Sequence, residues 1–166
     1  MRFLKILLTI LTIYNVEANS NTQNQKIFSN WIAHIEQKSN KKICYAFTEH
    51  YKRSLLDQRK PKALFVVNYS PQKHFTLSYL PGFLIDTDFL VKLKFSNKEI
   101  ALDNKYQTFA ATYSAQQDIN IIDLFIKEAE ENFVIKSFRK KKQAALDYFS
   151  LVGFKQAITY LRSNCY

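Results

Sequence analysis

The C-terminal segment, residues 143–165, constrains the fold of this chain more than any other stretch. Its first half carries the crowded aromatic residues that are typical of a β-strand. Its second half repeats apolar residues at helical spacing, and this stripe consists of Leu151, Phe154, Ala157, Ile158 and Leu161. Cys165 then follows, one residue before the last. We therefore expect a final helix that packs on a sheet and is tied at its end to the rest of the domain.

The first eighteen residues have the features of a secretory signal. Arg2 and Lys5 precede a short apolar run at residues 6–14, and small residues at positions 16 and 18 suit a signal peptidase. The run is well short of the roughly 20 residues that span a bilayer, although an uncleaved N-terminal anchor is the alternative. The predicted organisation is a signal peptide at 1–18, a flexible polar lead-in at 19–27 and a single domain at 28–166.

Export changes the interpretation of the cysteines. Cys44 and Cys165 are the only two in the sequence, and oxidising compartments favour disulfides. A zinc site is the alternative, but neither cysteine has histidine or carboxylate partners at short spacing. A bridge closing so long a loop would stabilise the fold by about 4–5 kcal/mol.

Short apolar runs with alternating patterns dominate the remaining chain and predict a β protein. Hydrophobic residues make up 47% of the sequence, enough to build a core. The run 42–47 is apolar on both faces, as in a buried strand. In the run 89–95, Lys92 and Lys94 are predicted to point outward. Gly82 is predicted to supply a positive φ in a turn. The predicted strands cover residues 28–35, 42–47, 63–69, 75–80, 89–95, 99–102, 108–113, 133–138 and 144–149.

Two helices are predicted among these strands. Residues 118–131 form an amphipathic pattern, with Asp118 as its expected N-cap and a frayed acidic end. Ser150 is placed to cap the C-terminal helix. Gly153 lowers helix propensity by about 1 kcal/mol relative to Ala, so its presence in the first turn indicates a close approach to the sheet.

The chain resembles the invasion-associated locus B family of bacterial envelope proteins. The specific match is the C-terminal motif, formed by Asp147, Ser150, Leu151, Gly153 and Phe154 and followed by the final cysteine. Weaker correspondences extend the resemblance over residues 31–165. Two positions depart from the family pattern, because Lys140 stands where a glycine is usual and Phe109 stands near a usual tryptophan.

The resemblance implies an immunoglobulin-like β-sandwich with an added helix, exported to the periplasm or outer surface of a Gram-negative bacterium. It also implies an association with host-cell invasion and no catalytic chemistry. The expected partner is therefore an envelope or host-surface component. An enzyme with an unrecognised site remains the alternative from another class.

The formal net charge of +10 suits an anionic partner. Nucleic acid fits the charge but not the export signal, which leaves anionic lipid or glycan. Two basic stretches, at 52–62 and 139–142, are predicted loops that either dock on such a surface or only keep the protein soluble. The candidate contacts are Lys52, Arg53, Arg59, Lys60, Lys62, Arg139, Lys140, Lys141 and Lys142.

Other chemistry lacks support in the sequence. The three histidines show no metal-binding spacing, and no GxSxG motif is present, so neither a metal site nor a cofactor is predicted. Asp86 and Asp88 fall in a predicted turn, where aspartate is common. Asp147 is expected to pair with Arg139 or Lys141 across a hairpin.

Overall fold

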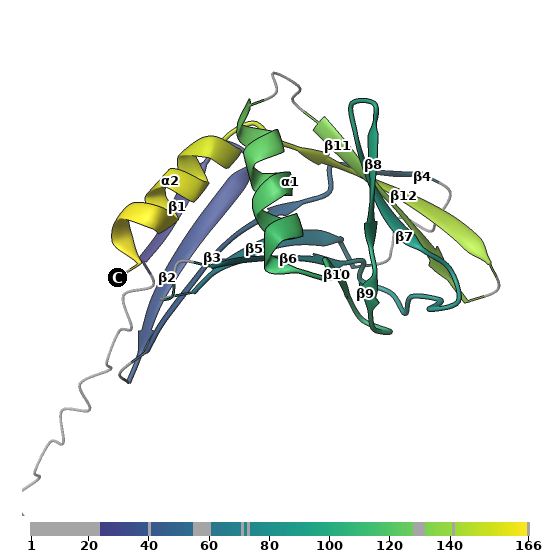
Figure 1. Ribbon diagram of the computed structural model, residues 1–166, viewed down its shortest axis with the longest axis horizontal. Coiled ribbons are helices and arrows are strands. Elements are labelled where there is room, and N and C mark those ends of the chain that lie inside the picture. The colour runs from purple at the N-terminus through teal and green to yellow at the C-terminus, as the bar shows by residue number, and fades with distance from the viewer. Residues whose placement is uncertain are drawn as a thin grey trace, which may run out of the picture.

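The computed structural model describes residues 24–39, 41–54, 61–70, 72, 74–127, 132–140 and 142–165. Within them, two antiparallel β-sheets and two helices form the domain (Figure 1). This confirms the predicted mainly β sandwich with helices. The predicted signal at residues 1–18 lies outside the described residues. No helix in the described part of the chain is long and apolar enough to cross a membrane.

The larger sheet has seven strands in the order β1–β2–β3–β5–β6–β10–β9. These strands are β1 Asn24–Phe28, β2 Trp31–Lys38, β3 Lys41–Glu49, β5 Leu64–Tyr69, β6 Phe75–Leu80, β9 Asn104–Lys105 and β10 Ala110–Ala111. The smaller sheet has five strands in the order β4–β12–β11–β7–β8. They are β4 Lys52–Ser54, β7 Val91–Phe95, β8 Lys98–Leu102, β11 Asn132–Arg139 and β12 Gln143–Ser150.

Both helices, α1 Ala115–Lys127 and α2 Phe154–Asn164, lie on the same side of the seven-stranded sheet (Figure 1). Helix α2 packs on β1, β2 and β3, and α1 packs on β6. Their apolar stripes therefore cover the part of this sheet that the five-stranded sheet does not reach.

Aromatic side chains join the two sheets and the helices in one core. Phe65 of β5 lies 4.9 Å from Phe133 of β11, and Phe133 stacks on Phe149 of β12 at 5.1 Å, measured between ring centroids. Phe125 of α1 lies 5.5 Å from Phe154 of α2. Edge-to-face and offset contacts of this kind add to the free energy gained by burying the rings.

The strand patterns follow the alternation in the sequence. The predicted pair at 63–69 and 75–80 is present as β5 and β6, with Leu64 opposite Leu80 and Tyr69 opposite Phe75. The side chains of Lys92 and Lys94 point away from the core, as predicted, between the buried Val91, Leu93 and Phe95. Gly82 has a φ of 71°, which confirms the predicted positive φ.

Three strand predictions need correction. Strand β1 begins at Asn24, so residues 24–27 belong to the sheet and not to a flexible lead-in. Strand β3 is buried on one face only, because Ile43 on its other face is 42% exposed. The strand predicted at 108–113 is reduced to Ala110–Ala111, since the chain there turns toward α1.

Helix α1 starts earlier than predicted, and Asp118 is not its cap. Ser114 occupies that position, and its Oγ accepts a hydrogen bond of 3.3 Å from the Gln117 amide. Asp118 is instead buried in the first turn, where it accepts hydrogen bonds from the Leu77 amide and the Thr112 hydroxyl. Burial raises the pKa of the Asp118 carboxyl above its ordinary value. Residues 128–131, where fraying was predicted, lie outside the described residues.

The start of α2 also differs from the prediction. Ser150 is the last residue of β12, and Gly153 occupies the N-cap position with a φ of 95°. A Cβ atom at Gly153 would lie 1.8 Å from the Phe28 carbonyl oxygen. The glycine therefore permits the close approach that the sequence indicated, but to the β1–β2 turn and immediately before the helix.

Candidate functional site

The two cysteines form the predicted disulfide. Cys44 of β3 and Cys165 at the end of α2 are bonded, with their Cα atoms 6.2 Å apart and 121 positions between them in the sequence. Both residues are almost fully buried. The bridge holds the end of α2 on the seven-stranded sheet, which is a structural role.

The C-terminal motif residues also serve the fold. The Ser150 hydroxyl accepts hydrogen bonds from the Asn30 side chain at 2.9 Å and from the Val152 amide at 3.2 Å. The Trp31 indole donates to the Ser150 carbonyl at 2.9 Å and lies 4.8 Å from the Phe154 ring. Leu151 is buried. The motif therefore fixes how β12 leads into α2.

Asp147, the first residue of that motif, lies at the centre of a buried polar network. Its carboxylate pairs with Arg53, from Nε to Oδ1 and from a terminal nitrogen to Oδ2 at 2.9 Å. The Tyr79 hydroxyl donates to the same carboxylate and contacts the Ser137 hydroxyl at 3.0 Å. The predicted pairing of Asp147 with Arg139 or Lys141 is wrong, because Asp147 points into the core opposite Arg53 of β4.

The network gives the fold a pH-dependent stability. Burial raises the pKa of Tyr79 well above its ordinary value of 10.0, and the Asp147 carboxylate raises it further. A group whose pKa is higher in the folded than in the unfolded protein stabilises the fold fully at a pH below its unfolded-state pKa. This stabilisation is lost as the pH rises through its folded-state pKa. Above about pH 10, wild-type stability should thus fall by up to about 1.4 kcal/mol per pH unit from this group alone.

Tyr79→Phe should remove the part of the stability loss above about pH 10 that comes from Tyr79, and it should lower the stability near neutral pH. Urea unfolding of both proteins at about pH 8 and about pH 11 measures the difference. Parallel loss of stability in the two proteins would show that Tyr79 titrates normally in the fold.

The predicted basic contacts divide into four groups. The Arg53 side chain is only 4% exposed and pairs with Asp147, so its prediction as a surface contact is wrong. Lys62 pairs with Glu49, and the half-buried Arg139 lies with Arg53 over the Phe83 ring. Lys52, Lys140 and Lys142 are exposed. Arg59, Lys60 and Lys141 lie outside the described residues.

A continuous basic surface is formed by strands and not by loops. The outward side of the five-stranded sheet carries Lys52 on β4, Lys92 and Lys94 on β7, Lys136 on β11 and Tyr148 on β12, which we term the lysine face. The register places Lys136 opposite Lys92, and Tyr148 opposite both Lys52 and Val134. Neighbouring strands lie about 4.8 Å apart, so these side chains form one continuous surface.

The lysine face is hollowed, with a cavity of about 610 Å³ that Lys92, Lys94, Lys136 and Tyr148 help to line. Lys52 Nζ lies 5.3 Å from the centre of the Tyr148 ring, and Lys136 Nζ lies 5.3 Å from that of Phe138. Cations held over aromatic rings in this way remain available to a further anionic partner.

The pKa of Glu99, which lines the same cavity, is affected by the positive charge of the surrounding lysines. Glu99 pairs with Lys92, and this hydrogen bond and charge lower the pKa of Glu99, with smaller contributions from Lys94 and Lys136. In the described part of the chain, Lys94 and Lys136 form no ion pair. The described residues that line the cavity therefore carry a net positive charge.

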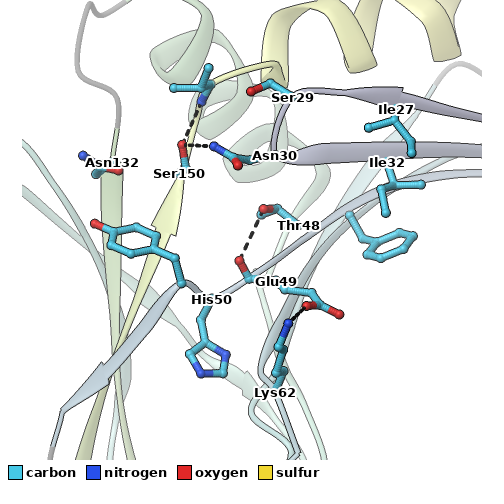
Figure 2. Close-up of a pocket in the computed structure, with 13 residues that line it drawn as sticks. Ile27, Ser29, Asn30, Ile32, Thr48, Glu49, His50, Lys62, Asn132 and Ser150 are labelled. Atoms are coloured by element: carbon cyan, nitrogen blue, oxygen red, sulfur yellow. Dashed lines mark hydrogen bonds and ion pairs between the residues drawn. The ribbon is translucent and has the colours of Figure 1, made fainter.

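A second cavity, of about 650 Å³, lies where the chain crosses from β3 to β4, and we term it the polar cleft. In Figure 2 the side chains of Asn30, Thr48, Asn132 and Ser150 stand around a common space, with Ile27 and Ile32 together on one side. His50 points away from that space (Figure 2). Its Nδ1 accepts a hydrogen bond of 2.8 Å from the Ala63 amide.

The histidines do not assemble a metal site. His34 is buried with its ring 4.9 Å from that of Tyr45, whereas His74 is exposed beside the β5–β6 turn. Among the described residues, no group of three or more histidine, cysteine, aspartate or glutamate side chains is arranged to hold a metal ion.

Only part of the lysine face could be predicted from sequence patterns. The outward direction of Lys92 and Lys94 follows from alternation, but their proximity to Lys136 and Lys52 depends on strand order. Strands β7 and β11 are separated by more than thirty positions of the sequence, which include α1. Strand β4 pairs with β12, which lies near the other end of the sequence. Charge runs in the sequence therefore pointed to loops, and the assembled surface was missed.

No protein-family model matches the sequence, and no curated protein is similar to it in sequence. The solved structures with a similar fold include that of invasion associated protein B from Bartonella henselae. The two share 13% sequence identity at a TM-score of 0.60, over 84% of this chain and 96% of that chain. At this level of identity the comparison shows a shared fold, which supports the family resemblance as a structural relationship.

Proposed function

We propose that this chain is an exported envelope protein that binds an anionic glycan through the lysine face and performs no catalysis. The observation that carries the proposal is the assembly of three lysines and Tyr148 around one hollow, with Lys52 held over the Tyr148 ring, from four separate strands. The buried disulfide supports export, because such bonds persist in oxidising compartments. The structural neighbour is named for invasion, and we propose attachment at the cell surface as the corresponding role here.

The shape of the lysine face favours a glycan over a lipid bilayer. Proteins that lie on membranes insert protruding apolar side chains below the headgroups. On this face, Val134, Phe138 and Leu146 are instead half-buried between the lysines. A concave basic surface suits a flexible anionic chain that can enter the hollow.

The proposal predicts a charge-specific loss of binding. Lys94→Gln/Lys136→Gln should weaken binding to dextran sulfate at least tenfold at physiological salt, and wild-type affinity should fall steeply with added salt. The control is Lys127→Gln/Lys155→Gln, which changes the net charge equally at exposed sites on the two helices. Biolayer interferometry over a salt series, with neutral dextran as a second control, measures both effects.

Equal losses in the two double variants would show that only overall charge matters and would contradict the proposal. Binding to vesicles containing phosphatidylglycerol, with none to dextran sulfate, would show that the lysine face binds lipid and not a glycan. Binding to neither probe would overturn the lysine face as a binding site.

A further inference from the structure

The lysine face and the polar cleft meet at one corner of the domain. Asn132, the first residue of β11, lines both cavities. It lies two residues before Val134, or about 7 Å along an extended strand, and Val134 is opposite Lys94. The Asn132 side chain is exposed, and it forms no hydrogen bond with any described residue.

A pair of tyrosines marks the same corner independently. Tyr51 lines the polar cleft, Tyr148 lines the hollow of the lysine face, and their ring centroids are 6.4 Å apart. The Tyr51 amide donates to the Tyr148 carbonyl at 3.0 Å, which fixes the two residues relative to each other. Tyr51 is 59% exposed, so its ring is available to a ligand passing from one cavity to the other.

The chemistry of the polar cleft differs from that of the lysine face. Its charged residues, Glu49 and Lys62, pair with each other, so the cleft has no net charge to offer. Apart from His50, which bonds to Ala63, its remaining polar side chains are amides and hydroxyls, and its apolar wall includes Ile27, Ile32 and Phe47. Uncharged donors and acceptors beside an apolar wall complement a neutral sugar, which presents hydroxyl groups on its edge and C–H groups on its ring face.

We infer that the two cavities form one binding groove for an oligosaccharide, with an anionic sugar on the lysine face and neutral sugars in the polar cleft. This inference rests on the proposed function and specifies its ligand. The combined groove is large enough for several sugar units, since single ligand sites commonly occupy about 300–1,000 Å³. Asn132 and Tyr51 are the contacts at the bend between the two parts.

Ligands of equal charge and different length test the groove. One probe is a monosaccharide monophosphate, and the other is a tetrasaccharide that carries the same single phosphate on its terminal sugar. Amide NMR titrations of the protein should give a dissociation constant at least tenfold lower for the tetrasaccharide. Its shift changes should extend from the lysine face to Asn30 and Thr48, whereas those of the monosaccharide should remain on β7, β11 and β12.

Variants separate the two parts of the groove. Asn132→Leu and Tyr51→Ser should weaken tetrasaccharide binding by a much larger factor than monosaccharide binding, and so remove most of the length effect. Tyr113→Ser is the matched control, because Tyr113 is 82% exposed and lies outside both cavities. Lys94→Gln/Lys136→Gln should lower the affinity for both ligands by the same factor.

The outcomes distinguish this inference from the function on which it rests. If both probes bind with equal affinity and Asn132→Leu changes neither, the lysine face binds anions but the groove does not exist. If neither probe binds while dextran sulfate does, the groove is also overturned, because the partner is then recognised by charge density alone. Stronger binding of an acidic peptide of the same charge and length than of the tetrasaccharide would assign the cleft to a protein partner instead.

Discussion

Replacing either cysteine by alanine is expected to lower the free energy of unfolding by about 4–5 kcal/mol, and replacing both should lower it by the same amount. The bond between Cys44 and Cys165 closes 121 positions of the chain, so its loss releases a large conformational entropy in the unfolded state. The two single changes should not add, because each removes the same bond. For a domain with an ordinary stability of about 5–15 kcal/mol, this is a major share.

The loss should appear first in α2. This helix is the last element of the fold, and beyond the disulfide it is held by the packing of Phe154, Ala157, Ile158 and Leu161. Urea unfolding measures the global change, and amide hydrogen exchange measures the protection of α2. Reduced wild-type protein is the control and should match the variants. Additive losses in the double variant would mean that each cysteine stabilises the fold by its own packing.

The local features of the fold could be predicted from the sequence because short-range physics determines them. Alternation gave β5, β6 and the outward lysines of β7, and helical spacing gave the stripe of α2. A positive φ at Gly82 followed from the turn that a Pro-Gly pair favours. The disulfide followed from the cysteine count and the predicted export signal, without knowledge of the distance between the two residues.

The errors arose where a residue's partner is distant in the sequence. Asp118 and Ser150 both had the chemistry of helix caps, but Asp118 instead accepts a hydrogen bond from Leu77 of β6, and Ser150 accepts one from Asn30 in the β1–β2 turn. Arg53 sits in a basic stretch that resembles a solvated loop, yet it is buried because Asp147 compensates its charge. No local pattern reveals a partner 94 positions away.

That buried pair leads to a second large expected effect, because Arg53→Met should lower the free energy of unfolding by about 3–5 kcal/mol. The change leaves the Asp147 carboxylate buried without a cation, and it removes the hydrogen bond of 2.6 Å from Arg53 to the Pro81 carbonyl. Asp147→Asn should cost less, since the Arg53 guanidinium keeps Pro81 and the Phe83 ring as partners. Urea unfolding of the single and double variants completes a double-mutant cycle.

In that cycle, the double variant Arg53→Met/Asp147→Asn should be more stable than the sum of the single losses predicts, because it buries no charge at this position. Tyr79 would still donate to the side chain at position 147, and its contact with Ser137 would remain.

The network also affects binding, since Arg53 holds in place the three-residue strand β4 that carries Lys52. Arg53→Met should therefore weaken dextran sulfate binding about as much as Lys52→Gln does. Additive stabilities and unchanged binding would mean that backbone pairing with β12 alone holds β4, and that the buried pair has no part in positioning the lysine face.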